Sequence, residues 1–265
     1  MSKFVRSSKV RHLFGKEQKA EEMVTDVRVG RGTGDHQYIK GNSKFWACAA
    51  QGAGGTLYVV PHSFGGKLPR DTKHITGHTA QIFDFDFNPF HDQMIATGSD
   101  DSTVKIWGIP SDEGLTENIS DPLVDIAEAH MRKVTFVTFN PCASNVLATG
   151  SADHTVKLWD IEQPEEAKWV GAIPDLIQDL KWNYNGSLLG TTCKDKMFRL
   201  YDPRAGGEAT VTIQDHAGSK CSKMTFLGDT TKFLTCGFSK TNKREFKVWD
   251  IKDTSKPLFT HGIDR

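Results

Sequence analysis

Two sets of side chains in this sequence contain the residue types of a hydrolytic triad. A serine hydroxyl, an imidazole and a carboxylate together supply a nucleophile, a general base and the group that orients the base. Each set is followed by a tryptophan, and the second set repeats the first after 52 residues. Because a repeat explains both sets, we interpret them as structural rather than catalytic. They are His78, Ser99, Asp101 and Trp107, and then His130, Ser151, Asp153 and Trp159.

The remaining candidates for chemistry also favour structural roles. Asp84 and Asp86 have the types of a carboxylate pair for acid–base work, but they alternate with three phenylalanines, Phe83, Phe85 and Phe87. Alternation in a strand places both carboxylates on one face of the sheet. The histidines at the start of the repeats are accounted for by the repeat itself. We therefore expect no catalytic residue, no metal, no cofactor and no enzymatic activity.

A repeated unit organises the chain. The residues between His78 and Trp107 recur between His130 and Trp159 with the same offset of 52. Weaker copies follow, and a less regular unit precedes them. Short apolar, β-branched and aromatic runs are separated by Asn-Pro, Asn-Gly and Gly-Ser turns, which indicates antiparallel strands with tight connections. A unit of about 40–45 residues with Gly-His near its start and Trp-Asp near its end is typical of a WD40 propeller blade.

The sequence thus predicts an all-β protein, a WD40 β-propeller. Within a blade we expect a hydrogen-bonded chain in which Trp107 donates, Ser99 relays and His78 connects the serine to Asp101. The second set would form the same chain one blade later. The expected blades span residues 36–70, 74–109, 123–162, 166–204 and 207–253, after a basic arm at residues 1–35.

Five blades fall within the range of about four to eight that propellers use, yet two features predict that the chain is truncated. No set of strand-like runs follows Asp250, so residues 254–265 are expected to begin a further connection. The arm at residues 1–35 is expected to supply a strand to a closing blade that lies beyond the five.

Composition and charge exclude several classes of protein. Lys plus Arg and Asp plus Glu are 33 each, so the formal net charge is zero, which argues against a nucleic-acid binder. No run of about 18 apolar residues occurs, so no membrane span is expected. Five scattered cysteines without a CxxC pair predict reduced thiols of a cytosolic protein. The charge is unevenly distributed along the sequence, because residues 1–31 carry a net charge of +4 and the remaining residues a net charge of −4.

Motifs outside the generic repeat resemble those of the coronin family, and they extend over residues 2–253. Near the N-terminus they are Ser8-Lys9-x-Arg11-His12-x-Phe14-Gly15 and Asp26-Val27-Arg28-Val29. Further along they are Trp107-Gly108-Ile109-Pro110, Pro174-Asp175-Leu176-Ile177, Trp182-Asn183-x-Asn185-Gly186-Ser187, Cys193-Lys194-Asp195-Lys196, Asp202-Pro203-Arg204 and Gly237-Phe238-Ser239-Lys240.

The resemblance implies a non-enzymatic protein of the cytoplasm and cell cortex that binds actin filaments (F-actin). Coronin propellers have seven blades, and their N-terminal strand helps to close the last one. By motif, the filament-contacting arginine of the family falls on Arg28, and we expect Arg6, Lys9, Arg11 and Arg31 to assist it. A C-terminal coiled coil gives coronins their oligomers and their contact with the Arp2/3 complex. This chain lacks that segment, so both properties are expected only of a full-length form that carries it.

Two departures from the family pattern affect the expected blades. Ile173 stands where a histidine often precedes Pro-Asp-Leu, and the fifth blade has an insertion at Asn242–Glu245 in place of the turn aspartate. We expect these two blades to be held by packing rather than by the complete hydrogen-bonded chain. A generic WD40 interaction scaffold, for example a substrate adaptor of a ubiquitin ligase, is the alternative function.

Overall fold

The computed structural model describes residues 19, 21–30, 37–52 and 54–263, which form strands, turns and loops without a helix. Within these residues most strands belong to five four-stranded antiparallel sheets. Sheet one contains β2 (Ile39–Gly41), β3 (Phe45–Ala49), β4 (Gly55–Pro61) and β6 (His74–His78), and sheet two contains β7 (Ile82–Phe87), β8 (Met94–Ser99), β9 (Val104–Gly108) and β10 (Val124–Ile126). Sheet three contains β11 (Val134–Phe139), β12 (Val146–Ser151), β13 (Thr155–Asp160) and β14 (Trp169–Ala172). Sheet four contains β15 (Ile177–Trp182), β16 (Leu189–Cys193), β17 (Met197–Tyr201) and β18 (Val211–Gln214), and sheet five contains β19 (Lys223–Phe226), β20 (Lys232–Phe238), β21 (Arg244–Asp250) and β22 (Phe259–Gly262).

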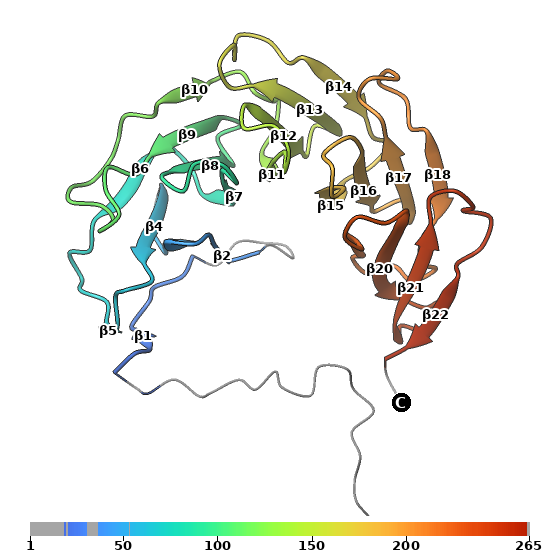
Figure 1. Cartoon of the computed structure of the whole chain (residues 1–265), viewed down its shortest axis with the longest axis horizontal. Helices are drawn as coiled ribbons and strands as arrows, with labels where there is room; N and C mark the ends of the chain where they lie inside the picture. The colour runs from blue at the N-terminus through green and yellow to red at the C-terminus, as the bar shows by residue number, and fades with distance from the viewer. Residues whose placement is uncertain (1–18, 20, 31–36, 53, 264–265) are drawn as a thin grey trace, which may run out of the picture.

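The five sheets follow one another around an open arc, with sheet one at one end and sheet five at the other (Figure 1). The first strand of a sheet lies on the inside of the arc and the last strand on the outside, as β7 and β10 show in sheet two. Radial four-stranded sheets of this kind are the blades of a propeller. The prediction of an all-β, propeller-type fold is therefore confirmed.

Each sheet takes its outer strand from the following sequence unit. β6 contains Gly77-His78, which open the second unit, yet it pairs with β4 in sheet one. The predicted blade boundaries are therefore one strand out of step with the sheets. The same rule corrects the C-terminal prediction. Residues 259–262 do not begin a further connection, because β22 pairs with β21 and completes sheet five.

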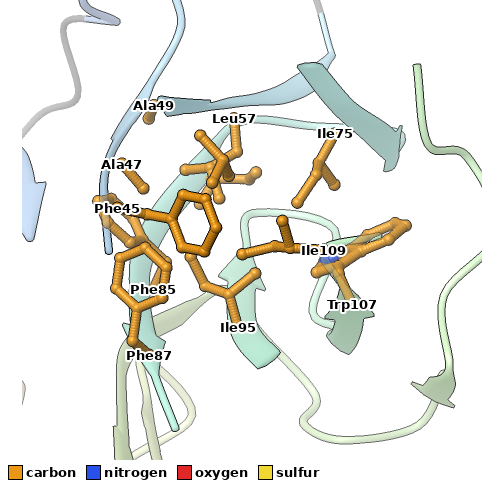
Figure 2. Close-up of a cluster of buried hydrophobic side chains, with 12 residues drawn as sticks. Phe45, Ala47, Ala49, Leu57, Ile75, Phe85, Phe87, Ile95, Trp107 and Ile109 are labelled. Atoms are coloured by element: carbon orange, nitrogen blue, oxygen red, sulfur yellow. The ribbon is translucent and has the colours of Figure 1, made fainter. Parts of the chain in front are cut away.

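The core lies between neighbouring sheets rather than within one. Between sheets one and two, Phe45, Leu57 and Ile75 meet Phe85 and Trp107, and all five side chains are almost fully buried (Figure 2). Burying an aromatic side chain removes about 150–250 Å² from water, at roughly 25 cal/mol for each Å² that is apolar. Similar clusters lie between the later sheets. The faces of the sheets therefore stabilise one another in sequence around the arc.

Carboxylates on the inner strands also connect the sheets. Asp84 on β7 accepts a hydrogen bond of 2.9 Å from the Val137 amide of β11, and it forms an ion pair of 2.7 Å with Lys40 of β2. Asp179 on β15 accepts a hydrogen bond of 2.8 Å from the Met224 amide of β19. Burial lowers the pKa of Lys40, but the neighbouring carboxylates outweigh it and hold the pKa above its usual value. The acidic residues of the inner strands are thus structural links.

The described part of the N-terminal arm packs on sheet one. β1 (Val24–Thr25) pairs in parallel with β5 (Gly66–Lys67), and Val29 forms an antiparallel bridge with Ala50. Residues 24–25 of the predicted arm therefore form a separate two-stranded sheet with the segment between β4 and β6, and Val29 bridges to the end of β3. Most of the remaining arm lies outside the described residues.

Candidate functional site

The predicted hydrogen-bonded chain exists in sheet two, but its hydroxyl is supplied by Thr97. The Trp107 indole donates to Thr97 Oγ1 at 2.8 Å, and His78 Nε2 lies 2.8 Å from the same oxygen. His78 Nδ1 lies 2.9 Å from Asp101 Oδ2. Ser99 is not the relay, because its hydroxyl donates to the Ala80 carbonyl at 3.0 Å and accepts from the Asp101 amide. Because His78 is the last residue of β6, the outer strand of sheet one, this hydrogen-bonded chain connects sheet one to sheet two.

Sheet three repeats this arrangement one unit later. Trp159 donates to Thr149 Oγ1 at 2.9 Å, and His130 connects Thr149 to Asp153 at 2.8 and 2.9 Å. Ser151 is again not the relay, since its hydroxyl donates to the Arg132 carbonyl at 3.0 Å. The predicted roles of Ser99 and Ser151 were therefore wrong for the same reason. In each sheet the serine lies two residues after the threonine on the same strand. The two hydroxyls therefore lie on the same face of the strand, and spacing alone does not distinguish them.

Sheet five contains a complete chain, contrary to the prediction. His216 Nε2 and the Trp249 indole lie 3.1 and 3.0 Å from Thr235 Oγ1, and His216 Nδ1 lies 2.9 Å from Glu245 Oε1. The insertion lengthens the β20–β21 hairpin, in which Gly237 pairs with Glu245 and Phe238 with Arg244. The longer hairpin brings a glutamate on β21 to the place of the missing turn aspartate.

Sheet four is held by packing, as its sequence predicts. Ile173 is buried in the cluster between sheets three and four, and Tyr201 occupies the position of the tryptophan. The hydroxyl of Thr191, which corresponds to Thr97, is buried without a hydrogen-bond partner among the described residues. Asp195 instead forms an ion pair with Arg199.

Burial and hydrogen bonding shift the pKa values of three groups in the histidine–carboxylate pairs of sheets two and three. Burial raises the pKa of the Asp101 carboxyl, but hydrogen bonds from His78 and Thr103 outweigh it and hold the pKa well below its usual value. Asp153 is affected in the same way, to a pKa of about 2. Burial lowers the pKa of His130 to about 4, despite its aspartate. The His130 imidazole is thus neutral at physiological pH. The side chains of His78 and His130 are both fully buried, so a substrate in solution could not reach them.

His74 and His78 are four residues apart, a spacing that can hold a metal when it occurs on a helix. Here both lie on the strand β6, and their ring nitrogens are engaged separately. His74 Nδ1 lies 3.0 Å from the Thr72 carbonyl, whereas His78 belongs to the chain described above. In the described part of the chain no group of three or more His, Cys, Asp or Glu side chains is arranged to hold a metal ion.

The turns that carry the histidines and carboxylates of the hydrogen-bonded chains lie at the same ends of the strands, on one face of the arc of sheets. We call this face the histidine rim. These turns are the ones between the second and third strands of each sheet and the connections from each sheet to the next, and hydrogen bonds join them, as from the Asp100 amide to the Gln81 carbonyl. The turns at Ser102, His154, Lys196 and Asn242 share a left-handed residue with φ between 60° and 69°. The remaining turns and connections form the opposite rim.

Arg28 is exposed and lies next to the histidine rim. Its carbonyl accepts a hydrogen bond of 2.8 Å from the amide of Gln51, which follows β3 at this rim. Its neighbours Val27 and Val29 line a hollow of about 390 Å³ together with the exposed side chains of Tyr38 and Ile39. The predicted assisting residues Arg6, Lys9, Arg11 and Arg31 lie outside the described residues. Arginine beside an apolar, partly aromatic hollow is the composition typical of protein-binding surfaces.

Two family models match this chain. Residues 70–108 and 122–160 match the WD domain, G-beta repeat, and residues 3–67, which include Arg28, match a domain of unknown function named DUF1899. Together with the radial sheets and the Trp–Thr–His–Asp chains, these matches define a protein of the WD40-repeat class.

Curated relatives of this chain include coronins. It is 38% identical to a coronin-like protein of Schizosaccharomyces pombe, over 97% of this chain and 43% of the relative. It is 36% identical to a coronin-like protein of Saccharomyces cerevisiae, over 96% and 40%, and 35% identical to human coronin-2A, over 98% and 50%. The WD40 domain of Toxoplasma gondii coronin has a similar structure, with a TM-score of 0.86 and 31% identity over 91% of this chain and 62% of that one. The resemblance to coronins is therefore confirmed, and the chain spans about half the length of the curated relatives it matches.

Sequence reasoning missed the threonine relays, Glu245 and the pairing of Lys40 with Asp84. Thr97 and Thr149 stand at the same place in the repeat, and this repetition is a signal that could have identified them. Nothing local marks Glu245 or Lys40, because their partners lie 29 and 44 residues away in the sequence. The described residues include no helix of the length and apolarity that a membrane span requires.

Proposed function

We propose that this chain is a propeller portion of a coronin-type protein that binds the side of actin filaments, and that it acts as a non-enzymatic interaction surface in the cytoplasm and at the cell cortex. The observation that carries the proposal is the position of Arg28. It is exposed at the rim where sheet one ends, beside an apolar hollow, and it belongs to a motif that resembles the coronin family.

The contact we propose is electrostatic with an apolar complement. Arg28 would meet acidic residues of the filament while the hollow beside it excludes water from the contact. Exposed charge pairs are individually weak, at about 0.2–1 kcal/mol, so several contacts or several copies along a filament are needed for tight binding. Complementary charge also speeds encounter and makes binding sensitive to salt.

Replacing Arg28 with aspartate tests the proposal directly. We expect Arg28→Asp to weaken co-sedimentation with filamentous actin by at least tenfold at about 50 mM salt, since it replaces an attractive charge with a repulsive one. Wild-type binding should also weaken between about 50 and 150 mM salt. The thermal midpoint should not change, because no described contact depends on the Arg28 side chain. Undiminished pelleting of the folded variant would remove Arg28 from the contact.

Contact with the Arp2/3 complex and oligomerisation remain proposals for a longer form that carries a coiled coil. The alternative, a generic WD40 scaffold, is favoured by one feature of the opposite rim. A groove of about 510 Å³ lies there at the ends of β11, β15 and β19, lined by Phe139, Trp182, Tyr184 and Phe226. A scaffold that uses this groove alone would not pellet with actin at low salt.

A further inference from the structure

The exposed charges of the molecule are divided between its two rims. On the histidine rim, counting Arg28, the exposed side chains comprise eight basic and two acidic residues. They are Arg28, Arg132, Lys194, Lys196, Lys220, Lys240, Lys243 and Arg244, against Asp100 and Glu128. On the opposite rim, outside the N-terminal arm and with residues at strand ends counted in the same way, the exposed side chains comprise eight basic and eleven acidic residues. The described part of this nearly neutral chain therefore has one basic rim and one acidic rim.

Most of the basic residues gather at the far end of the arc from Arg28. Five lysines, which we call the lysine cluster, lie on three adjoining segments of sheets four and five: Lys194, Lys196, Lys220, Lys240 and Lys243. The Lys196 ammonium donates to the Ala217 carbonyl at 3.1 Å. The Gly218 amide donates to the Phe238 carbonyl, and the Lys220 ammonium lies 4.7 Å from the centre of the Phe238 ring. These contacts make the three segments one continuous surface.

The carboxylates on the same segments are already engaged or buried. Asp195 is paired with Arg199, Glu245 accepts from His216 and also pairs with Lys247, and Asp215 is buried. No lysine of the cluster forms an ion pair within the described residues. The cluster therefore presents positive charge that the molecule itself does not neutralise, which is the condition for recognising an acidic partner.

We infer that the lysine cluster is a second contact for an acidic filament, so that one copy of this chain binds through both ends of its basic rim. This inference rests on the proposed function and extends it. Arg28 lies beside sheet one and the cluster lies on sheets four and five, and the arc of sheets begins with sheet one and ends with sheet five (Figure 1). A compact acidic partner would cover one end only, whereas an extended partner that repeats its acidic surface can meet both. Two contacts on one rigid body bind more tightly than either alone.

The test reverses charge at three lysines of the cluster that make no described side-chain contact. The variant K194E/K240E/K243E is compared with K73E/K252E/K256E, which makes the same charge change at exposed positions of the opposite rim. The matched control separates a local effect from the change in net charge. Each variant is first shown to have the same melting temperature as wild type, which confirms that it is folded. Co-sedimentation with filamentous actin at about 50 mM salt is then measured for both triple variants, for Arg28→Asp and for wild type.

We expect the cluster variant to bind at least tenfold more weakly than the control, and the control to stay within about threefold of wild type. Equal binding by the cluster variant and the control would overturn the inference. It would leave the proposed function standing if Arg28→Asp is still defective. If wild type itself does not pellet, both the inference and the proposed function fall.

Discussion

At the scale of single residues, a threonine hydroxyl is the centre of each hydrogen-bonded chain. Thr97 accepts from Trp107 and donates to the unprotonated nitrogen of His78, whose other nitrogen donates to Asp101. This assignment of donors follows from the network as a whole, since a neutral imidazole has one donor and one acceptor. All of these groups are buried or half-buried, so a lost partner is not replaced by water.

Removing the hydroxyl of Thr97 should therefore cost more than removing that of Ser99. Thr97→Val preserves the shape but leaves the Trp107 donor and the His78 acceptor unpaired, at about 1–3 kcal/mol each. Ser99→Ala removes bonds to backbone groups at the edge of the turn and should cost about 0.5–1.5 kcal/mol. Urea unfolding of both variants provides the comparison. A larger loss for Ser99→Ala would contradict the assignment of the relay.

The buried imidazole of His130 makes stability depend on pH. Its pKa is lowered to about 4 in the folded chain, whereas an exposed histidine titrates near 6.5. Between these values the unfolded chain binds the additional proton, so stability falls as the pH falls from about 6.5 to about 4. A pKa difference of about 2.5 corresponds to a free energy of about 3 kcal/mol. Asp153, with its pKa lowered to about 2, adds a loss below about pH 4.

This pH dependence is checked by urea unfolding at pH 7 and pH 4.5. Wild type should lose stability over this interval, and His130→Gln, although less stable at pH 7, should lose less because it lacks the titrating group. Equal losses for the two proteins would show that His130 is not responsible.

At the scale of strands and sheets, the inner-strand carboxylates take the place of covalent ties between blades. Asp84 contacts sheet one through Lys40 and sheet three through the Val137 amide. Three sheets therefore meet at one side chain. Removing such a group leaves its partners buried and unpaired, which is costlier than the loss of the bonds themselves.

We expect Asp84→Ala to lower the free energy of unfolding by about 3–5 kcal/mol, because it leaves the Lys40 ammonium without its carboxylate. Adding Lys40→Met should recover part of that loss, since the orphaned charge is then absent. Denaturant unfolding of the two variants distinguishes this account from simple cavity formation, in which the second substitution would bring no recovery.

The sequence predicts the features that recur in every repeat, but not those that depend on pairing between distant segments. Repeats with a fixed offset predict the strands, the WD40 class and three of the four members of each chain, because those features recur. Thr97 and Ser99 cannot be separated by spacing, since both lie on the same face of β8. Glu245, Lys40 and the outer strand β22 depend on pairings between distant segments, and no local pattern encodes them.

At the scale of the whole molecule, the exchange of outer strands makes neighbouring units depend on one another. Sheet four is complete only when the chain continues through β18, which belongs to the fifth sequence unit. A chain ending at residue 206 should therefore melt at a lower temperature and aggregate more than one ending at residue 216. It leaves β17 as an unpaired edge, and edges of that kind invite association. Calorimetry and light scattering on the two chains provide the test, and equal behaviour would contradict it.

The division of charge between the rims has a consequence for how the chain is handled in solution. A protein of zero formal charge is ordinarily expected to pass through ion-exchange resins near neutral pH. This one presents a cationic edge to a sulfonate resin and an anionic edge to a quaternary-amine resin, so at low salt it should be retained by both. The net charge sums over all residues of the protein, whereas an ion-exchange resin interacts only with the charges on the side of the protein that faces it.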